Sequence, residues 1–347
     1  MTLILPAVPD VHDAALAQRL QQRIDRKTKP LGALGRLEAL ALQVGLIQQT
    51  ESPRWDAPQL IVFAGDHGLA ARGVSAYPSD VTWQMVENFL AGGAAVSVLA
   101  RQHALALTVV DAGVRHDFAP RPGLLVRKIA AGTADATQGP AMTEAQCLGA
   151  IAMGREVVQG LPGNVVLLGE MGIGNTSAAA LLLARLTGTE LSLCVGRGTG
   201  LDDAGLAHKL GVLSEVMQRH VTLSDPLQVL AAMGGFEIAG LVGAVLQAAS
   251  ERRTIVVDGF ITGAAVLVAS QLVPAVLGYC VWSHRSAESG HGVMVRHLAA
   301  QPLLDMALRL GEGSGAALAW PLLVSAVNVL NDMASFEAAG VSDREPS

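Results

Sequence analysis

The chain has 347 residues, enough for one large domain with an accessory part or for two modest domains. Apolar residues make up 51% of it and charged residues 16%, so it has the apolar surface that disordered proteins lack. The formal net charge is −6, which leaves no global basic field to attract a phosphate polymer. Nucleic acid is therefore not expected as a partner.

The cysteines and the N-terminal segment indicate a cytoplasmic protein. The three cysteines, Cys147, Cys194 and Cys280, are far apart and form no C-x-x-C pair. This usage suggests neither a disulfide framework nor a zinc ribbon, and it fits a reducing compartment. The first residues, MTLILPAVPD, have no basic region before a short apolar stretch, so no signal peptide is expected.

The N-terminal segment has helical spacing of apolar residues. Residues 13–50 carry this spacing, and the pattern is interrupted by KTKPLGALG, where proline and glycine are frequent. These residues are predicted to form a helical arm. Residues 313–331 are predicted to form a late apolar helix after GEGSG.

From residue 59 the pattern changes to short apolar runs, each followed by a glycine-rich turn. These runs are QLIVFAGDHG, LTVVDAGV, NVVLLGEMGIGNTS and TIVVDGFITG. Three of them lead into helical patterns, and the second leads into a long loop. Strands that alternate with helices are typical of an α/β domain with a mainly parallel, doubly wound sheet.

Residues 259–283 carry no charge and are long enough to raise the question of a membrane span. Glycines and Pro274 interrupt the segment, and TIVVDG before it has the pattern of a buried strand. A buried strand, turn and helix is therefore favoured, and no membrane span is expected.

In doubly wound sheets, ligands bind beyond the carboxyl ends of the strands, where helix N-termini point inward. The turn GEMGIGNTS follows a strand and opens a helix. Gly172 and Gly174 allow backbone amides to approach an anion, and Asn175, Thr176 and Ser177 can cap the helix or donate to the anion. A phosphate site and an ordinary strand-to-helix turn are equally compatible with this pattern, because it is neither a Walker loop nor G-x-G-x-x-G.

Two glutamates, Glu170 and Glu312, stand within glycine-rich turns. A carboxyl group in a partly dry pocket has a raised pKa and can act as a base. The alternative, favoured from the residues alone, is that each glutamate complements a helix macrodipole. Similarly, Lys209 can reach a phosphate or simply be solvated on a helix.

Asp66, His67, His284, Glu288 and His291 include metal-ligand residue types. Their spacing matches no standard ligand motif, so no metal is expected, and hydrogen bonds that order loops are the favoured interpretation. A metal-dependent hydrolase that uses Asp66, His67, His284 and His291 is the alternative. No cofactor is expected.

Seven ordered segments together resemble one family, the nicotinate-nucleotide dimethylbenzimidazole phosphoribosyltransferases. The segments are TKPLGALGRLE (28–38), FAGDHGLAARGVSAYPSDVTWQMVENFLAGGAAV (63–96), LGEMGIGNTSAAA (168–180), GRGTGLDDAG (196–205), VDGFITGAAV (257–266), SHRSAESGHG (283–292) and LRLGEGSGAALAWPLL (308–323). The resemblance covers nearly the whole chain.

The resemblance implies transfer of 5-phosphoribose from nicotinate mononucleotide to 5,6-dimethylbenzimidazole, with inversion at the anomeric carbon. The products are α-ribazole 5′-phosphate and nicotinate. By resemblance, Glu312 is the general base. The positions implied to bind the mononucleotide are Glu170, Lys209, the turn 172–177, Gly198, Gly200 and Ser286. Those implied to form the base pocket are Tyr77, Gln84, Met85, Met171 and Leu310.

The chemistry agrees with these implied roles. Nicotinate leaves from a cationic pyridinium, so the leaving group needs no acid, whereas the incoming base must lose a proton. One glutamate therefore suffices. The acceptor is left open between dimethylbenzimidazole, another benzimidazole, a purine and a phenol, because such bases differ by only about 1 to 3 kcal/mol per group.

The resemblance also implies an architecture. This is a Rossmann-like three-layer domain over 56–310, with a small helical domain formed by 1–55 and 311–347, in a homodimer whose active sites use both subunits. The alternative to the enzyme is a non-catalytic nucleotide-binding or sensor protein of the same fold.

Overall fold

We describe a computed structural model of the chain, covering residues 4–198 and 200–342. The strands are β1 (Gln59–Gly65), β2 (Ala106–Gly113), β3 (Leu124–Val126), β4 (Val165–Met171), β5 (Thr254–Val257) and β6 (Cys280–Trp282). The α-helices are α1 (Ala14–Asp25), α2 (Arg36–Gln48), α3 (Asp80–Ala91), α4 (Ala95–Gln102), α5 (Glu144–Gln159), α6 (Asn175–Thr187), α7 (Leu191–Cys194), α8 (Asp203–Arg219), α9 (Pro226–Met233), α10 (Phe236–Ser250), α11 (Phe260–Leu272), α12 (Ser289–His297), α13 (Ser314–Asp332) and α14 (Phe336–Ala339). Short 3-10 helices occupy Gly68–Arg72 and Pro274–Tyr279.

The six strands form one sheet in the order β3-β2-β1-β4-β5-β6, and all five pairings are parallel. This order places β1 and β4 side by side at the centre, where the chain reverses its direction of winding. The predicted mainly parallel α/β sheet is confirmed. The cavity described below opens at the carboxyl ends of these strands.

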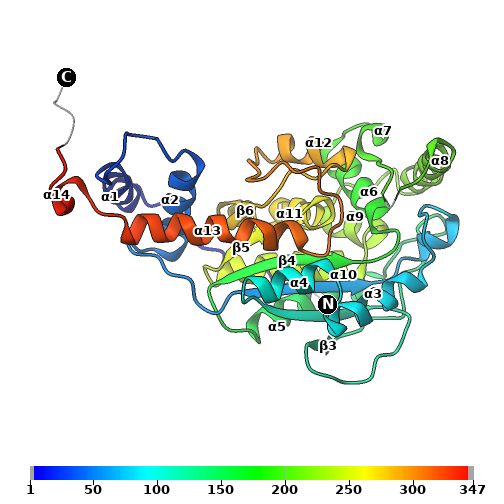
Figure 1. Cartoon of the computed structure of the whole chain (residues 1–347). Coiled ribbons are helices and arrows are strands. Elements are labelled where there is room, and N and C mark those ends of the chain that lie inside the picture. Colours follow the sequence, from blue (N-terminus) through cyan, green and yellow to red (C-terminus); the bar gives the residue numbers. More distant parts are fainter. Residues whose placement is uncertain (1–3, 199, 343–347) are drawn as a thin grey trace.

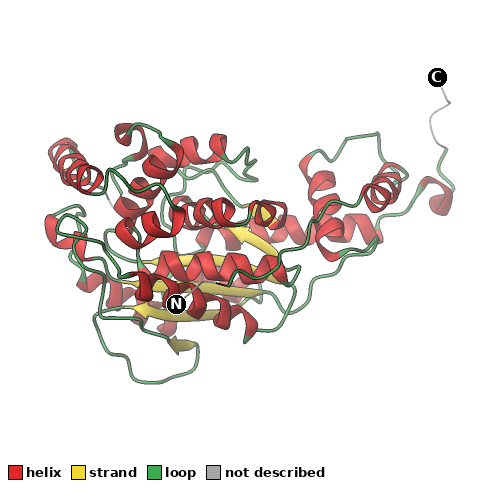
Figure 2. Ribbon diagram, turned by 180° about the vertical axis from the view of Figure 1, so that it is seen from behind, coloured by secondary structure: helices red, strands yellow, loops and turns green. Residues whose placement is uncertain are grey.

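The sheet is covered by helices on both faces, which gives three layers (Figures 1 and 2). Residues of β1 alternate between the layers: Ile61 and Phe63 pack in one hydrophobic cluster with α5, α6, α9, α10 and α11. Leu60 and Val62 pack in the other cluster with α1 to α4 and α13. Burial on both faces explains the continuous apolar runs of the central strands, since neither side of the sheet faces water.

The helices α1 and α2 lie together with α14 and the far end of α13 at one side of the sheet (Figure 1). Trp55 packs edge-on against Trp320 with ring centroids 5.0 Å apart, and its indole nitrogen donates to the Leu323 carbonyl. An antiparallel bridge joins Lys27 to Ser335. The helices predicted for 13–50 and 313–331 are confirmed, while their status as a separate small domain, with boundaries at 55 and 311, stays a prediction.

Residues 259–283 form α11, a 3-10 helix and β6, all packed in the protein, as the sequence favoured. A different helix, α13, is long and apolar enough to cross a membrane by length and composition alone, but 56% of its apolar window is buried within the fold. Core helices of this length pass the same test, so α13 is weak support for a membrane span.

Candidate active site

A cavity of about 370 Å³ lies at the carboxyl ends of β4, β5 and β6. Its walls come from the end of β4 and the start of α6, from the turn after β5, from the segment after β6, from the start of α3 and the loop before it, and from residues 309–312 before α13. This is the edge of the sheet at which ligands bind in doubly wound folds.

Most of the residues predicted for the site line this cavity. They are Glu312, Glu170, Gly172, Asn175, Thr176, Gly198, Ser286, Tyr77, Met85, Met171 and Leu310. Five others lie outside the lining: Gly174, Ser177, Gly200, Lys209 and Gln84. Of these, Gln84 is exposed on α3, whereas Lys209 and Ser177 are buried behind the wall.

The turn 172–177 brings the N-terminus of α6 to the cavity. Gly174 adopts a left-handed φ of 98° directly before the helix, a conformation that favours glycine. Gly172 packs so closely against the Gly65 carbonyl oxygen that a side chain there would collide with it. Asn175 and Thr176, the first two residues of α6, line the cavity, so the N-terminus of this helix lies at its wall.

Lys209 of α8 is fully buried, so the interpretation that it is solvated is wrong. Its Nζ donates to Thr176 Oγ1 at 3.0 Å and to the Gly196 carbonyl at 3.2 Å. Burial lowers the pKa of Lys209 to about 8, although the nearby Glu288 carboxylate acts in the opposite direction. The ammonium group therefore lies directly behind Thr176, a residue of the cavity wall.

Glu312 is buried, with 5% of its surface exposed, and has a left-handed φ of 66° between Gly311 and Gly313, which are also left-handed. Burial, followed by the charge of Asp258, raises its pKa to about 7, while a hydrogen bond from the Val96 amide lowers it. Its Oε2 has no hydrogen-bond partner among the described residues. A carboxyl group with a free oxygen and a pKa near neutrality is suited to accept a proton.

Glu170 lies within β4 rather than at a helix start, so a macrodipole role does not fit it. It is 5% exposed, and its Oε2 accepts a hydrogen bond from the Asn175 side chain. Burial raises the pKa of Glu170 to about 8, and the charges of Asp258, Glu237 and Glu312 contribute in the same direction. The two glutamates thus both line the cavity, and both have pKa values well above the usual value for glutamate.

Asp66, His67 and His291 make hydrogen bonds that join or order loops. His67 Nε2 pairs with Glu237 Oε1 at 2.6 Å, and the Asp66 carboxylate accepts from the Arg115 amide at 2.8 Å. His291 Nδ1 accepts from the Ser286 amide at 2.8 Å and so orders the loop before α12. Within residues 4–198 and 200–342, no group of three or more His, Cys, Asp or Glu side chains is placed to hold a metal ion.

His284 and Glu288 also line the cavity, although the sequence suggested loop ordering for His284 and named Glu288 only as part of a disfavoured metal site. Two further residues were not singled out at all. Arg309 lines the cavity and donates to the Gly198 carbonyl at 3.1 Å. Asp258 is buried directly after β5, where a carboxylate at a strand end was the available signal.

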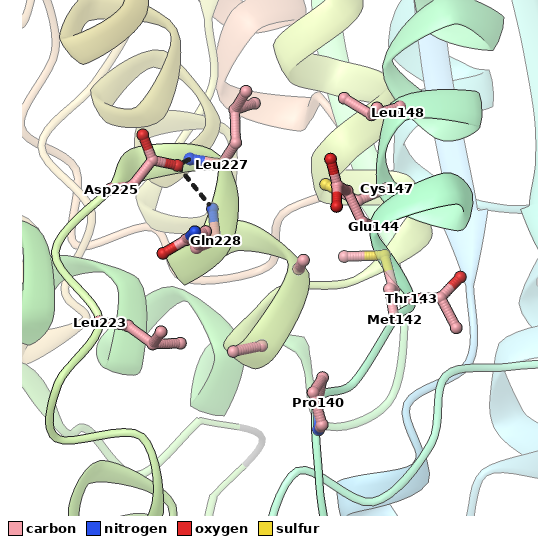
Figure 3. Close-up of a pocket in the computed structure, with 12 residues that line it drawn as sticks. Pro140, Met142, Thr143, Glu144, Cys147, Leu148, Leu223, Asp225, Leu227 and Gln228 are labelled. Atoms are coloured by element: carbon pink, nitrogen blue, oxygen red, sulfur yellow. Dashed lines mark hydrogen bonds between the residues drawn. The ribbon is translucent and has the colours of Figure 1, made fainter. Parts of the chain in front are cut away.

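A second cavity of about 440 Å³ lies between α5 and α9 (Figure 3). Met142, Cys147 and Leu148 face the start of α9, where Asp225 accepts hydrogen bonds from the Leu227 and Gln228 amides. Burial raises the pKa of the Cys147 thiol to about 12, which keeps it protonated and unreactive. The Asp225 carboxylate is already used as a helix cap, so this cavity lacks the convergent reactive groups of the first.

Comparisons with known proteins agree with the resemblance drawn from the motifs. A sequence model of a phosphoribosyltransferase family matches residues 10–341. The nicotinate-nucleotide–dimethylbenzimidazole phosphoribosyltransferase of Variovorax paradoxus (strain S110) is 68% identical over 341 residues, covering 98% of this chain and 98% of that protein. The protein of the same name from Dechloromonas aromatica (strain RCB) is 59% identical, covering 96% and 98%.

The solved structures give the same result. The crystal structure of CobT from Thermus thermophilus matches with a TM-score of 0.91 and 41% identity, covering 94% of this chain and 99% of that chain. The predicted α/β fold and the family resemblance are both confirmed by matches over almost the whole length. The chain belongs to the nicotinate-nucleotide–dimethylbenzimidazole phosphoribosyltransferase family.

Proposed function

We propose that this protein transfers 5-phosphoribose from nicotinate mononucleotide to 5,6-dimethylbenzimidazole, with inversion at the anomeric carbon. The observation that carries the proposal is the buried Glu312 carboxyl group, which lines the cavity with one oxygen free of partners among the described residues. Its pKa of about 7 suits a base that must both accept a proton and be ionised near neutral pH.

In the proposed step, one benzimidazole nitrogen attacks the anomeric carbon while the bond to the nicotinate nitrogen breaks. The electron pair of the breaking bond stays on nicotinate, whose ring loses its positive charge. The proton of the other benzimidazole nitrogen passes to Glu312. No covalent enzyme intermediate is required, so the main demand is that two bound substrates meet in line.

Glu170 is assigned a different role because its Oε2 is already bonded to Asn175, whereas Oε2 of Glu312 has no partner among the described residues. Burial and the neighbouring carboxylates raise the pKa of Glu170 to about 8, so this group can hold a proton near neutral pH. A protonated carboxyl group donates a hydrogen bond, and we assign Glu170 to a ribose or phosphate oxygen of the mononucleotide. Its Oε2 is held by Asn175, which fixes the orientation of the group.

The phosphate is assigned to the start of α6, where Asn175 and Thr176 line the cavity at the positive end of the helix. Lys209 supplies positive charge behind Thr176, and Arg309 supplies it at the rim. Gly198 and Ser286 line the same region and are assigned to the mononucleotide, whereas Gly200 lies outside the lining.

The acceptor base is assigned to the apolar part of the cavity, between Tyr77, Met85, Met171 and Leu310. Gln84 is exposed outside the lining, and its contact with the base stays a prediction. An apolar slot of this kind discriminates weakly between related flat bases, so other benzimidazoles and purines are expected to react more slowly rather than not at all.

We also propose that the protein acts as a homodimer in the cytoplasm. Tyr77 and Leu310 are 53% and 57% exposed at the rim of the cavity, although both are large and mainly apolar, and a second subunit would cover them. The three free, buried cysteines suit a reducing compartment. Sedimentation velocity should give twice the chain mass, and a monomer at micromolar concentration would refute the dimer.

The variant Glu312→Gln separates an enzyme from a nucleotide-binding sensor. It should bind nicotinate mononucleotide with nearly wild-type affinity and lose at least about 100-fold in kcat, because it keeps the shape of the site without a base. Wild-type binding without any turnover, for every acceptor offered, would instead support the sensor.

A further inference from the structure

We propose that Asp258 is a positioning residue for the transfer reaction: it holds the turn that carries Glu312 and sets the charge environment of the Glu170 and Glu312 pair. The inference rests on the proposed function, in which Glu312 accepts the proton. No part of that function requires Asp258 to touch a substrate, and Asp258 does not line the cavity.

The first support is the hydrogen bonding of the Asp258 carboxylate. Asp258 follows β5 and is 1% exposed. Its Oδ2 accepts from the Gly313 amide at 3.2 Å, and its Oδ1 accepts from the Ala316 amide at 3.1 Å. Both amides belong to the start of α13, directly after Glu312. The Asp258 carboxylate thus caps the N-terminus of α13, a helix whose own N-cap residue makes no side-chain hydrogen bond.

The second support is the backbone conformation that this cap maintains. Gly311, Glu312 and Gly313 are all left-handed, with φ values of 82°, 66° and 86°. A non-glycine residue in this region costs of order 1 kcal/mol or more, so the surrounding contacts must hold it there. Those contacts are the Asp258 cap on Gly313 and the bonds from Ser314 to the Gly311 carbonyl.

The third support is the placement of charge. The groups that face Glu312 are Asp258 from the end of β5, Glu170 from β4 and the Val96 amide from α4. Asp258 is, after burial, the largest cause of the raised pKa of both glutamates. Arg309, in the same segment as Glu312, directs its guanidinium to Gly198 instead.

On its other side Asp258 faces His284, which lines the cavity. His284 Nδ1 lies 3.8 Å from Asp258 Oδ1 and 3.1 Å from the Ser283 hydroxyl. Burial raises the pKa of Asp258, while His284 and the backbone amides lower it. The Asp258 carboxylate is therefore the shared neighbour of three cavity residues, Glu170, Glu312 and His284.

Two variants separate the two parts of the proposal. Asp258→Asn keeps the size and an oxygen acceptor but removes the charge, so the acidic limb of the kcat/KM profile should move to lower pH by roughly one unit. Asp258→Ala also removes the cap, so kcat should fall by about 100-fold through misplacement of Glu312, with a smaller change in KM. Asp111→Asn is the matched control, because Asp111 is fully buried in β2 away from the cavity.

Two further readouts do not depend on turnover. The carboxyl carbon of Glu312, followed by ¹³C NMR and assigned with Glu312→Gln, should titrate at lower pH in Asp258→Asn than in the wild type. Hydrogen exchange at the Gly313 and Ala316 amides should accelerate in Asp258→Ala. In Asp111→Asn, neither the titration of Glu312 nor the exchange of these two amides should change.

The proposal is overturned if Glu312 titrates in folded Asp258→Asn at the same pH as in the wild type and if hydrogen exchange at the Gly313 amide is unchanged in Asp258→Ala. If Asp258→Ala does not fold, the Asn variant decides alone, because it retains the shape of the side chain. A wild-type protein that forms no product refutes the proposed function instead, and the titration and exchange then still decide whether Asp258 positions Glu312.

Discussion

Gly169 of β4 lies in direct contact with the backbone of Glu312: a β-carbon on Gly169 would come within 2.5 Å of the Glu312 carbonyl carbon. The strand and the turn that carries the proposed base therefore touch through backbone atoms at this point. This close approach explains a glycine in the middle of an otherwise buried apolar strand.

Gly169→Ala is consequently expected to displace the turn and to reduce kcat by at least about tenfold, because small misplacements of a catalytic group are costly. Steady-state kinetics and thermal unfolding of both proteins check this. Gly211→Ala serves as the control, since Gly211 lies in α8 with no atom near the added carbon, and alanine there should leave activity unchanged. An active, stable Gly169→Ala protein would show that the turn is not fixed by this contact.

The pH dependence of kcat/KM should be bell-shaped with a maximum between pH 7 and 8. Glu312 must be ionised to act as a base, so the rate rises as pH increases through its pKa of about 7. Above pH 8, Glu170 loses its proton and Lys209 its charge, since both have pKa values of about 8, and the rate falls. Initial rates with limiting mononucleotide across a wide pH range measure the profile. A rate independent of pH on the acidic side would remove Glu312 from the role of base.

The free energy of unfolding should also depend on Glu312. Its folded pKa of about 7 lies above its usual value of 4.5, so its contribution to stability is fully present below pH 4.5 and is lost as pH rises through 7. Glutamine has no ionisable group, so in Glu312→Gln this loss of stability with rising pH does not occur. The variant should melt at nearly the wild-type temperature under acidic conditions and above it under alkaline conditions, by calorimetry or circular dichroism. A variant that is less stable than the wild type under alkaline conditions would contradict the raised pKa.

Lys209→Met should weaken binding of the mononucleotide and change kcat less. The substitution keeps the buried volume but removes the charge behind Thr176, and loss of a charged hydrogen-bonding group should raise KM roughly 10- to 100-fold. Inhibition by inorganic phosphate should weaken in parallel. Lys128→Met, outside the cavity, is the control. An unchanged KM in Lys209→Met would place the phosphate elsewhere, with Arg309 as the next group to test.

The long strands were predictable from sequence because they are buried on both faces and therefore read as continuous apolar runs. In contrast, β3 and β6 have only three residues each, too few to show a pattern. The predicted phosphate turn and both glutamates do meet at one cavity, because parallel strands end at the same edge of the sheet.

Other features of the site depend on packing that no local pattern encodes. Lys209 looks like a solvated helix residue by sequence, but in the fold it is buried where α8 meets α6 and the segment around Gly196. Asp258 lies in the segment VDGFITGAAV, but its role arises from the approach of residues 311–316 to the end of β5, which the segment itself does not indicate. The raised pKa values of the glutamates likewise follow from this approach.

The most direct test of the account is to incubate the purified protein with nicotinate mononucleotide and 5,6-dimethylbenzimidazole, with and without chelator, and to follow the products by mass spectrometry. The account predicts nicotinate and ribazole phosphate in equal amounts in both samples, and neither product with Glu312→Ala. No product from the folded wild-type protein, or product formed equally well by Glu312→Ala, would contradict it.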